Sequence, residues 1–227
     1  MPFDPSLGFS PWRLSGVVYG TLLNDPASLA ALGAAVEKPP YKAPPQAPVL
    51  YLKPRNTLSG PGSVINVPAA ATSVRVGVSL GIIIGRTACR VPANAADNFI
   101  AGYTVVNDIC LPHDNFYRPS LRFNARDGFC PIANARIAAA LVSDPDALAT
   151  RVWIDDEPVF EGSTGGRIRS VRRLLADVTE FMTLQPGDIL LLGASAGAPL
   201  AADGQRIRVE ISGIGSMENR VEREESR

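Results

Sequence analysis

The feature that most constrains the fold is an eleven-residue run of alternation at residues 74 to 84. One set of positions is wholly apolar, namely Val74, Val76, Val78, Leu80, Ile82 and Ile84. The intervening positions are Arg75, Gly77, Ser79, Gly81 and Ile83. Successive side chains of a β-strand point to opposite faces, so this period of two predicts a long strand with one apolar face.

Shorter segments indicate further strands and a few helices. Asp25 is expected to cap a helix that has Pro26 at its first position and runs to about Ala35, and Asn94 to cap a second, short one. Apolar residues recur at helical spacing from 170 to 182. Strands are expected at 15–19, 49–52, 136–142, 151–154, 189–192 and 206–214. Because strands outnumber helices and arrive in pairs, we expect an α+β fold, a mixed β-sandwich or open β-roll.

The chain has 227 residues, enough to bury a large core as one domain. We expect a lead-in with a strand and a short helix at residues 1–40, a main domain at 41–222 and a charged tail at 223–227. The charge-rich segment from Met217 onward is expected to be frayed and solvated.

Composition excludes several classes of function. Lysine and arginine total 22 against 22 aspartate and glutamate, so the chain lacks the basic surplus of a nucleic-acid-binding protein. Its apolar runs are too short to cross a bilayer, and its N-terminus lacks a secretory pattern, so we expect a cytoplasmic protein with no membrane partner. Cys89, Cys110 and Cys130 form no CxxC and are expected to be buried, reduced thiols.

The densest hydrogen-bonding chemistry lies in residues 102 to 133. This stretch holds the single histidine and a concentration of amide, carboxylate and guanidinium groups, so a site is sought here first. The candidates in it are Asn107, Asp108, His113, Asn115, Arg118, Arg122, Asn124, Arg126 and Asp127. Two interpretations of His113 are open, namely a proton carrier and an ordinary loop residue.

Four segments together resemble the fumarylacetoacetate hydrolase family. They are YKAPPQAPVLYLKPRNTLSG from Tyr41, IIIGRTACRV from Ile82, the stretch 102 to 133, and FMTLQPGDILLLG from Phe181. The details are similar to the N-terminal type of half in the family's decarboxylase/isomerase branch, whose two related halves are fused or separate. The resemblance implies a β-rich fold, dimers, and action on 5-carboxymethyl-2-oxo-hex-3-ene-1,6-dioate and 2-hydroxyhepta-2,4-diene-1,7-dioate in 4-hydroxyphenylacetate catabolism.

This chain departs from the family at the metal site. Metal-dependent members carry Glu-x-Glu on the strand before IIIGR and a third carboxylate later. Those positions are Gly77, Ser79 and Asp108 here, so one carboxylate is retained. A hard divalent cation would lose two of its three protein oxygens. We therefore expect this chain to bind no metal ion, with Mg²⁺ held by a homologous partner chain.

The resemblance also assigns substrate-binding candidates. Lys53 and Thr57 would line the pocket, although a solvated lysine after a strand is the plain alternative. Arg118 would clamp a dicarboxylate through paired hydrogen bonds. Asn124 stands where complete relatives have a lysine. Arg126 either contacts a ligand or forms an ion pair with Asp127.

Two more family features are changed. The segment GVVYGTLLND has no histidine where complete relatives have one. Ala194 replaces the threonine of the family's Gly-Thr-Pro wall, and Ser195 offers a hydroxyl beside it.

Three hypotheses follow. The first is a metal-poor subunit of a decarboxylase/isomerase, paired with a metal-binding homologue or with itself. The second is a metal-independent catalyst that uses Lys53, Arg118 and Arg126 with His113 as proton carrier. The third is a non-catalytic module that binds a small dicarboxylate or oxo acid.

Overall fold

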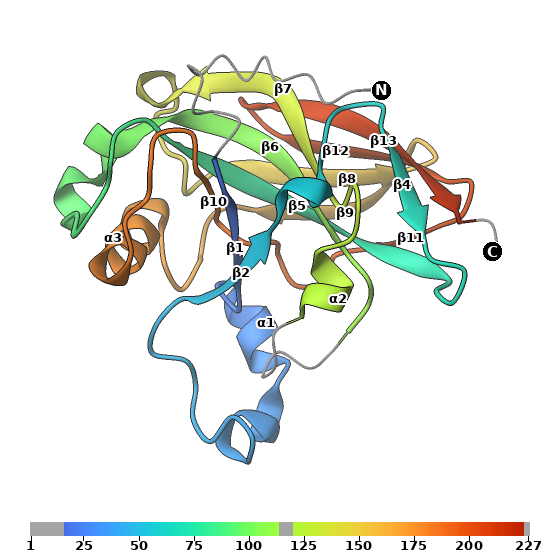
Figure 1. Cartoon of the computed structure of the whole chain (residues 1–227), viewed down its shortest axis with the longest axis horizontal. Helices are drawn as coiled ribbons and strands as arrows, with labels where there is room; N and C mark the ends of the chain where they lie inside the picture. The colour runs from blue at the N-terminus through green and yellow to red at the C-terminus, as the bar shows by residue number, and fades with distance from the viewer. Residues whose placement is uncertain (1–15, 114–119, 225–227) are drawn as a thin grey trace.

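The computed structural model describes residues 16–113 and 120–224, and its body is two packed β-sheets (Figure 1). The larger sheet has the order β2-β1-β10-β5-β6-β7-β3, with β11 pairing to β5 beside this path. Its strands are β1 (Val18–Leu22), β2 (Val49–Lys53), β3 (Leu58–Ser59), β5 (Ser73–Ile84), β6 (Ile100–Cys110), β7 (Cys130–Ala138), β10 (Ile189–Leu191) and β11 (Leu200–Ala202).

The second sheet has the order β4-β13-β12-β8-β9. Its strands are β4 (Val64–Val67), β8 (Ala149–Ile154), β9 (Glu157–Ser163), β12 (Arg206–Ile211) and β13 (Gly215–Arg223). Both sheets mix parallel and antiparallel pairs. The strands and few short helices confirm the expected α+β class.

The main apolar core draws on both sheets and contains the alternating face of β5. Val74, Val76, Val78, Leu80, Ile82 and Ile84 are all buried in it, together with residues of β8, β12 and β13. The predicted strand and its apolar face are therefore confirmed. The opposite face of β5 carries Gly77 and Ser79, and it is this face that forms part of the candidate site described below.

The expectation of a frayed end from Met217 was wrong. Residues 215–223 form β13, which pairs with β12 and β4. Met217, Asn219 and Val221 are buried, so the segment alternates in spite of its charges. The charged side chains lie on the other face of the strand, where solvent can reach them.

The helices are short. They are α1 (Pro26–Ala30), η2 (Gly33–Glu37), η3 (Arg55–Thr57), η4 (Ala93–Phe99), α2 (Leu121–Asn124), η5 (Ala139–Leu141) and α3 (Val171–Phe181). Asp25 caps α1 as predicted, accepting from the backbone N–H groups of Ala27 and Ser28. The helix ends at Ala30 rather than Ala35. The segment near Asn94 is a 3₁₀ helix that begins at Ala93 without a side-chain cap.

The helix over 170 to 182 is confirmed as α3. Ser170 caps it by accepting from the backbone N–H of Arg173. Its apolar side packs into the core through Val171, Leu174, Leu175 and Val178. No helix among residues 16–113 and 120–224 is long and apolar enough to cross a membrane.

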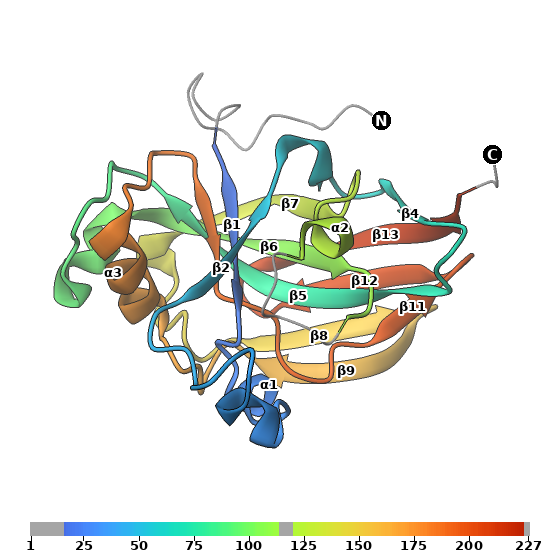
Figure 2. The same cartoon turned by 60° about the horizontal axis from the view of Figure 1, so that its bottom comes forward.

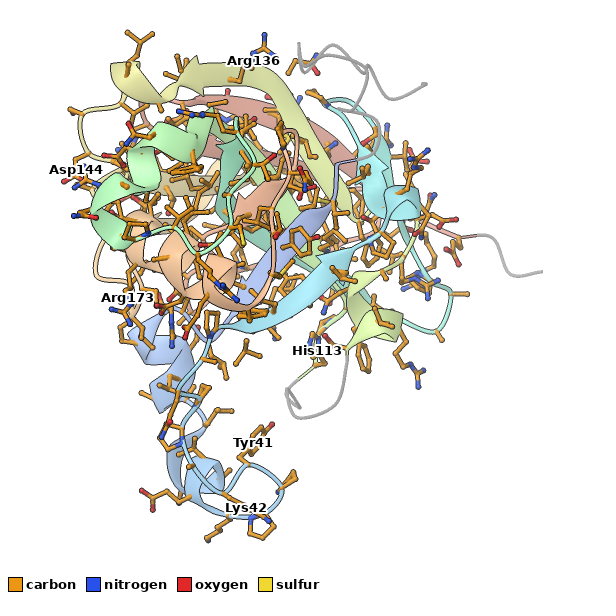
Figure 3. The ribbon with its side chains drawn as sticks, turned by 60° about the vertical axis from the view of Figure 1, so that its left-hand side comes forward. Tyr41, Lys42, His113, Arg136, Asp144 and Arg173 are labelled. Atoms are coloured by element: carbon orange, nitrogen blue, oxygen red, sulfur yellow. The ribbon has the colours of Figure 1, made fainter. Side chains whose placement is uncertain are left out.

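Residues 25–48, here called the arm, project from the sheets (Figures 1 and 2). The arm contains α1 and η2, and neither helix has a buried residue. Figure 3 shows Tyr41 and Lys42 at its tip, far from the sheets. The arm begins just after β1. Its base therefore lies beside the larger sheet and forms one wall of the candidate site described below.

Candidate functional site

The candidate site is a cavity of about 110 Å³ on the outer face of the β5–β6 ladder. Strands β1, β2, β5 and β6 contribute to it, as do α2 and the loop 193–198. Its lining includes Thr21, Leu22, Leu23, Ser28, Tyr51, Arg75, Gly77, Asp108, Cys110, His113, Asn124, Ala194, Ser195 and Ala198. A wider hollow of about 330 Å³ shares Ser28, Arg75, His113, Ser195 and Ala198 with it and extends to the arm at Ala31 and Leu32.

Asp108 is the carboxylate of this cavity, and it is already engaged by two side chains. Its Oδ1 lies 2.9 Å from the Nζ of Lys53 in an ion pair. Its Oδ2 accepts a hydrogen bond from the phenol of Tyr51. Burial, followed by the charge of Asp108, raises the pKa of Tyr51 well above its usual value, so the phenol remains a donor.

Lys53 is held in place by backbone as well as by Asp108. Its Nζ donates to the carbonyl oxygens of Ile109 at 2.6 Å, Asn124 at 3.1 Å and Phe129 at 3.0 Å. The side chain is 1% exposed and is not part of the cavity lining. An ammonium group has three N–H donors, so these contacts saturate it. Both expectations for Lys53, a pocket contact with a ligand and a solvated lysine, are thereby corrected, and the ammonium binds β2 to β6 and α2.

Neither residue at the two strand positions that the family resemblance assigns to metal-binding carboxylates is available to bind a metal ion. Gly77 pairs with Asp108 across the ladder, and a Cβ built on it would meet the backbone oxygen of Asp108 at 2.7 Å. Ser79 is buried, and its hydroxyl accepts from the backbone N–H of Gly193 at 3.1 Å. Within the described ranges no cluster of three histidine, cysteine, aspartate or glutamate side chains is arranged to hold a metal ion.

The loop walls are fixed by buried polar contacts. Asn24 donates to the carbonyl oxygens of Arg169 and Leu192, both at 3.0 Å, and so ties the end of β1 to two distant segments. Arg167 forms an ion pair with Asp25 at 2.7 Å and donates to the hydroxyl of Ser195 at 2.7 Å. These contacts hold Thr21 and Ser195 against the cavity.

His113 and Asn124 lie on the side of the cavity next to α2. The Nδ1 of His113 is 2.9 Å from the carbonyl oxygen of Leu111, and its ring stacks on Phe123 with centroids 4.9 Å apart. Figure 3 shows His113 beside α2. Asn124 is buried, and its side-chain amide donates to the hydroxyl of Ser120.

Besides Lys53, three further substrate-binding candidates lie away from the cavity. Thr57 is buried in η3, where its hydroxyl donates to the carbonyl oxygen of Pro54 at 2.7 Å. Asn107 is buried on the opposite face of β6 from Asp108. Arg126 lines a separate hollow and pairs with Glu224 at 3.4 Å. These placements correct the expected cavity contacts.

Two further expectations concern the ion pair of Arg126 and the clamp of Arg118. The internal ion pair of Arg126 with Asp127 is also corrected, because Asp127 instead accepts from the side chain of Asn56 at 2.7 Å. Arg118 lies outside the described residues, so its role as a clamp stays a prediction.

The cysteines differ from one another in exposure. Cys89 is exposed, which corrects the expectation of three buried thiols, whereas Cys130 is buried. Cys110 lines the cavity, and burial with the charge of Asp108 raises the pKa of its thiol to about 11. Burial raises the pKa of Cys130 to about 12. Both inner thiols are therefore protonated at neutral pH.

Sequence reasoning missed Tyr51, Thr21 and Arg75 as cavity residues. Tyr51 lies two residues before Lys53 on β2, so both side chains point to the same face. Arg75 precedes Gly77 by the same spacing on β5, and this alternation could have identified it. For Thr21 no local signal existed, since its place depends on pairing between β1 and β10, which are far apart in sequence.

With this geometry, a family assignment can be made. The family model described as "Fumarylacetoacetate (FAA) hydrolase C-terminal" matches residues 17–222. The chain belongs to the fumarylacetoacetate hydrolase family. The Escherichia coli protein named 4-hydroxyphenylacetate degradation bifunctional isomerase/decarboxylase is 37% identical over 208 residues, which cover 92% of this chain and 47% of that protein. The chain thus spans about half the length of the curated relatives it matches.

Solved structures of family members have the same fold. The 5-carboxymethyl-2-hydroxymuconate delta-isomerase from Mycobacterium smegmatis superposes with a TM-score of 0.76 at 29% identity, covering 93% of this chain and 80% of that one. A maleylpyruvate hydrolase from Sphingobium sp. SYK-6, in complex with manganese(II) and pyruvate, gives a TM-score of 0.74 at 27% identity, covering 92% of this chain and 71% of that one.

Proposed function

We propose that this chain is the metal-poor subunit of a two-subunit decarboxylase/isomerase in aromatic catabolism, assembled with a homologous metal-binding chain. Its substrates would be 5-carboxymethyl-2-oxo-hex-3-ene-1,6-dioate and 2-hydroxyhepta-2,4-diene-1,7-dioate. The observation that carries the proposal is the engagement of Asp108. Asp108 is the one carboxylate retained at the family's metal position, and it already binds the Lys53 ammonium and the Tyr51 phenol.

The likeness to one half of a bifunctional relative supports a role beside a second unit of the same family. That relative is named for an isomerase and a decarboxylase together, and this chain covers 47% of its length. A second chain of the same family would supply the remaining half. The pair of homologous chains would be the functional unit. The alternative to be tested is a homodimer of this chain.

The donor set at the metal position does not fit Mg²⁺, which prefers several oxygen ligands in octahedral geometry. Gly77 offers no side-chain oxygen, and the Ser79 hydroxyl already accepts from Gly193. A cation beside Asp108 would also be repelled by the Lys53 ammonium, 2.9 Å from the same carboxylate. We therefore assign no metal-dependent step to this chain.

The alternative of a metal-independent catalyst is less well supported. Lys53 contacts three carbonyl oxygens and Asp108, so it is not placed to meet a substrate. Arg126 lines a different hollow. Of the groups named for that mechanism that lie in the described part of the chain, His113 lines the cavity, whereas Lys53 and Arg126 do not.

The test is to purify the chain by itself and mixed with a homologue that carries the Glu-x-Glu pair. Turnover of the oxo-hexenedioate is then followed by its absorbance while Mg²⁺ is titrated. We expect the isolated chain to be at least about 100-fold slower than the mixture at every Mg²⁺ concentration, because a metal supplies several kcal/mol of transition-state stabilisation. Robust Mg²⁺-dependent turnover by the isolated chain would refute the proposal.

A matched pair of variants makes the test specific. Changing Glu-x-Glu to Gln-x-Gln in the homologue should abolish turnover of the mixture. Arg220→Gln in this chain should leave turnover unchanged, because Arg220 is a largely exposed residue of β13 that pairs with Glu222. Size-exclusion chromatography of the mixture should show a complex that contains both chains.

A further inference from the structure

We propose that Arg75 and Thr21 form a metal-independent subsite for a carboxylate group of a short dicarboxylate or 2-oxo acid. The inference rests on the proposed function for the class of ligand. The binding chemistry itself follows from the charges and hydrogen-bond donors around the cavity. It assigns to this chain a ligand contact of its own, in place of the contact that a metal ion would make.

Within residues 16–113 and 120–224, the charges around the cavity leave one guanidinium without a counter-ion. Asp108 is neutralised by Lys53, and Arg167 is neutralised by Asp25. Arg75 lines both the cavity and the wider hollow, and no ion pair joins it to a carboxylate among residues 16–113 and 120–224. Among the described residues the charged groups around the cavity therefore sum to a net positive charge, which favours an anion.

Arg75 is well placed to contact an acid that enters from the hollow. It lies on the outer face of β5, two residues before Gly77, and pairs across the ladder with Cys110. Since it contributes to the walls of both spaces, it lies where they meet. A guanidinium has a planar array of N–H donors that matches the two oxygens of a carboxylate.

Thr21 gives a second, independent indication of a ligand. It is 4% exposed and lines the cavity, and its hydroxyl has no hydrogen-bond partner in the described part of the chain. A buried hydroxyl without a hydrogen-bond partner is costly, and the large majority of buried polar side-chain atoms have a partner. A carboxylate or keto oxygen in the cavity would accept from it.

Ser195 offers a further donor in the lining of both spaces. Its hydroxyl oxygen accepts from Arg167, which leaves the hydroxyl proton to be donated elsewhere. The residues that replace the metal carboxylates also favour direct contact between an acid and Arg75. Side-chain carboxylates at Gly77 and Ser79 would repel an acid unless a cation bridged them, whereas a glycine and a serine let the acid meet Arg75 directly.

The experiment is calorimetric titration of the isolated chain with 2-oxoadipate in EDTA, with its neutral dimethyl ester as the ligand control. We expect the acid to bind and the ester not to bind. Arg75→Gln should weaken binding at least about tenfold, and Arg75→Lys less, because a charge-assisted hydrogen-bonded pair is lost. Thr21→Val should weaken binding about three- to tenfold, and Thr21→Ser should restore it.

Arg220→Gln serves as the matched arginine control and should bind as the parent chain does. Replacing EDTA by Mg²⁺ should leave the affinity within about twofold, since no metal takes part. Circular dichroism and thermal melting establish that each variant is folded. Unchanged affinity in Arg75→Gln, binding that requires Mg²⁺, or no binding to the parent chain would each overturn the inference.

The outcome is separable from that of the proposed function. If Arg75→Gln binds normally while turnover still requires the homologous chain, the subsite is refuted and the proposed function stands. If the isolated chain turns over substrate with Mg²⁺, the proposed function is refuted, and the effect of Arg75→Gln on acid binding in EDTA still decides the subsite.

Discussion

The two faces of the β5–β6 ladder are built by different kinds of interaction. The inner face packs apolar side chains such as Val76, Leu80 and Ile109 into the core between the sheets. The outer face carries Gly77 and Asp108 at its cavity end, which depends on charge and hydrogen bonding, whereas Ile83 and Val106 farther along the same face pack into a second apolar cluster. Any apolar residue of similar volume would serve on the inner face. The outer face instead requires particular partners from distant segments.

The largest expected effect is on the outer face, in Lys53→Met. The substitution leaves the Asp108 carboxylate and three carbonyl oxygens without their cation, and breaking a buried pair in this way costs about 3–5 kcal/mol of the free energy of unfolding. Urea denaturation measures it, with exposed Lys38→Met as the control. The double variant with Asp108→Asn should recover part of the loss. A loss below about 1 kcal/mol would contradict this account.

On the inner face we expect Ile82→Ala to lower the free energy of unfolding by about 2–5 kcal/mol. Ile82 is fully buried, so truncation removes apolar contacts and leaves a cavity. Leu141→Ala is the matched control, because Leu141 is 78% exposed and its truncation should stay within about 0.5 kcal/mol. Equal effects of the two substitutions in urea denaturation would show that Ile82 is not in the core.

A smaller effect is expected at Gly77, where the outer face leaves no room for a side chain. Gly77→Ala places a Cβ 2.7 Å from the backbone oxygen of Asp108, so the ladder must shift, at about 1–3 kcal/mol of unfolding free energy. Gly60→Ala is the control, since a Cβ there meets no atom within 4 Å. Thermal melting compares the two. Equal stability of the pair would show that β5 and β6 can separate enough to admit a side chain at residue 77.

The smallest effect concerns thiol reactivity rather than stability. At pH 8 a disulfide reagent should modify Cys89 first, because Cys89 is exposed, whereas Cys110 has a pKa of about 11 and little thiolate. Cys89→Ser should remove the fast phase seen by absorbance. A fast phase that persists would contradict the burial of Cys110 and Cys130.

The same raised pKa of Cys110 fixes the sign of a pH effect. The folded state favours the protonated thiol, so this contribution to stability is complete below the unfolded pKa of about 8.5. It decreases as the pH rises toward 11. Urea midpoints measured between pH 8 and pH 10 should therefore fall, and by less in Cys110→Ala.

The inner face could be predicted from sequence because its signal is local. Alternation at Val74 through Ile84 specifies both the strand and its buried side, whatever the partner strands are. The same signal was present in Met217, Asn219 and Val221, but the charged residues between them favoured a solvated tail. Charge on one face of a strand is compatible with burial of the other.

The outer face could be predicted only in part. Asp108, His113 and Asn124 were identified and do line the cavity. The role of Lys53 was not predictable, because its partners Asn124 and Phe129 lie more than 70 residues away. Chemistry that joins distant segments leaves no periodic pattern in the sequence.

The parallel pairing of β1 with β10 has a consequence for synthesis of the chain. Val18 and Tyr19 pair with Ile189 and Leu190, so β1 gains this neighbour only after all the strands between them in the sequence have been synthesised. Late closure of long-range pairs slows folding and leaves a strand edge open to other chains. The edge of β1 that β10 covers in the folded protein is therefore the edge at which a partly synthesised chain would pair with another chain.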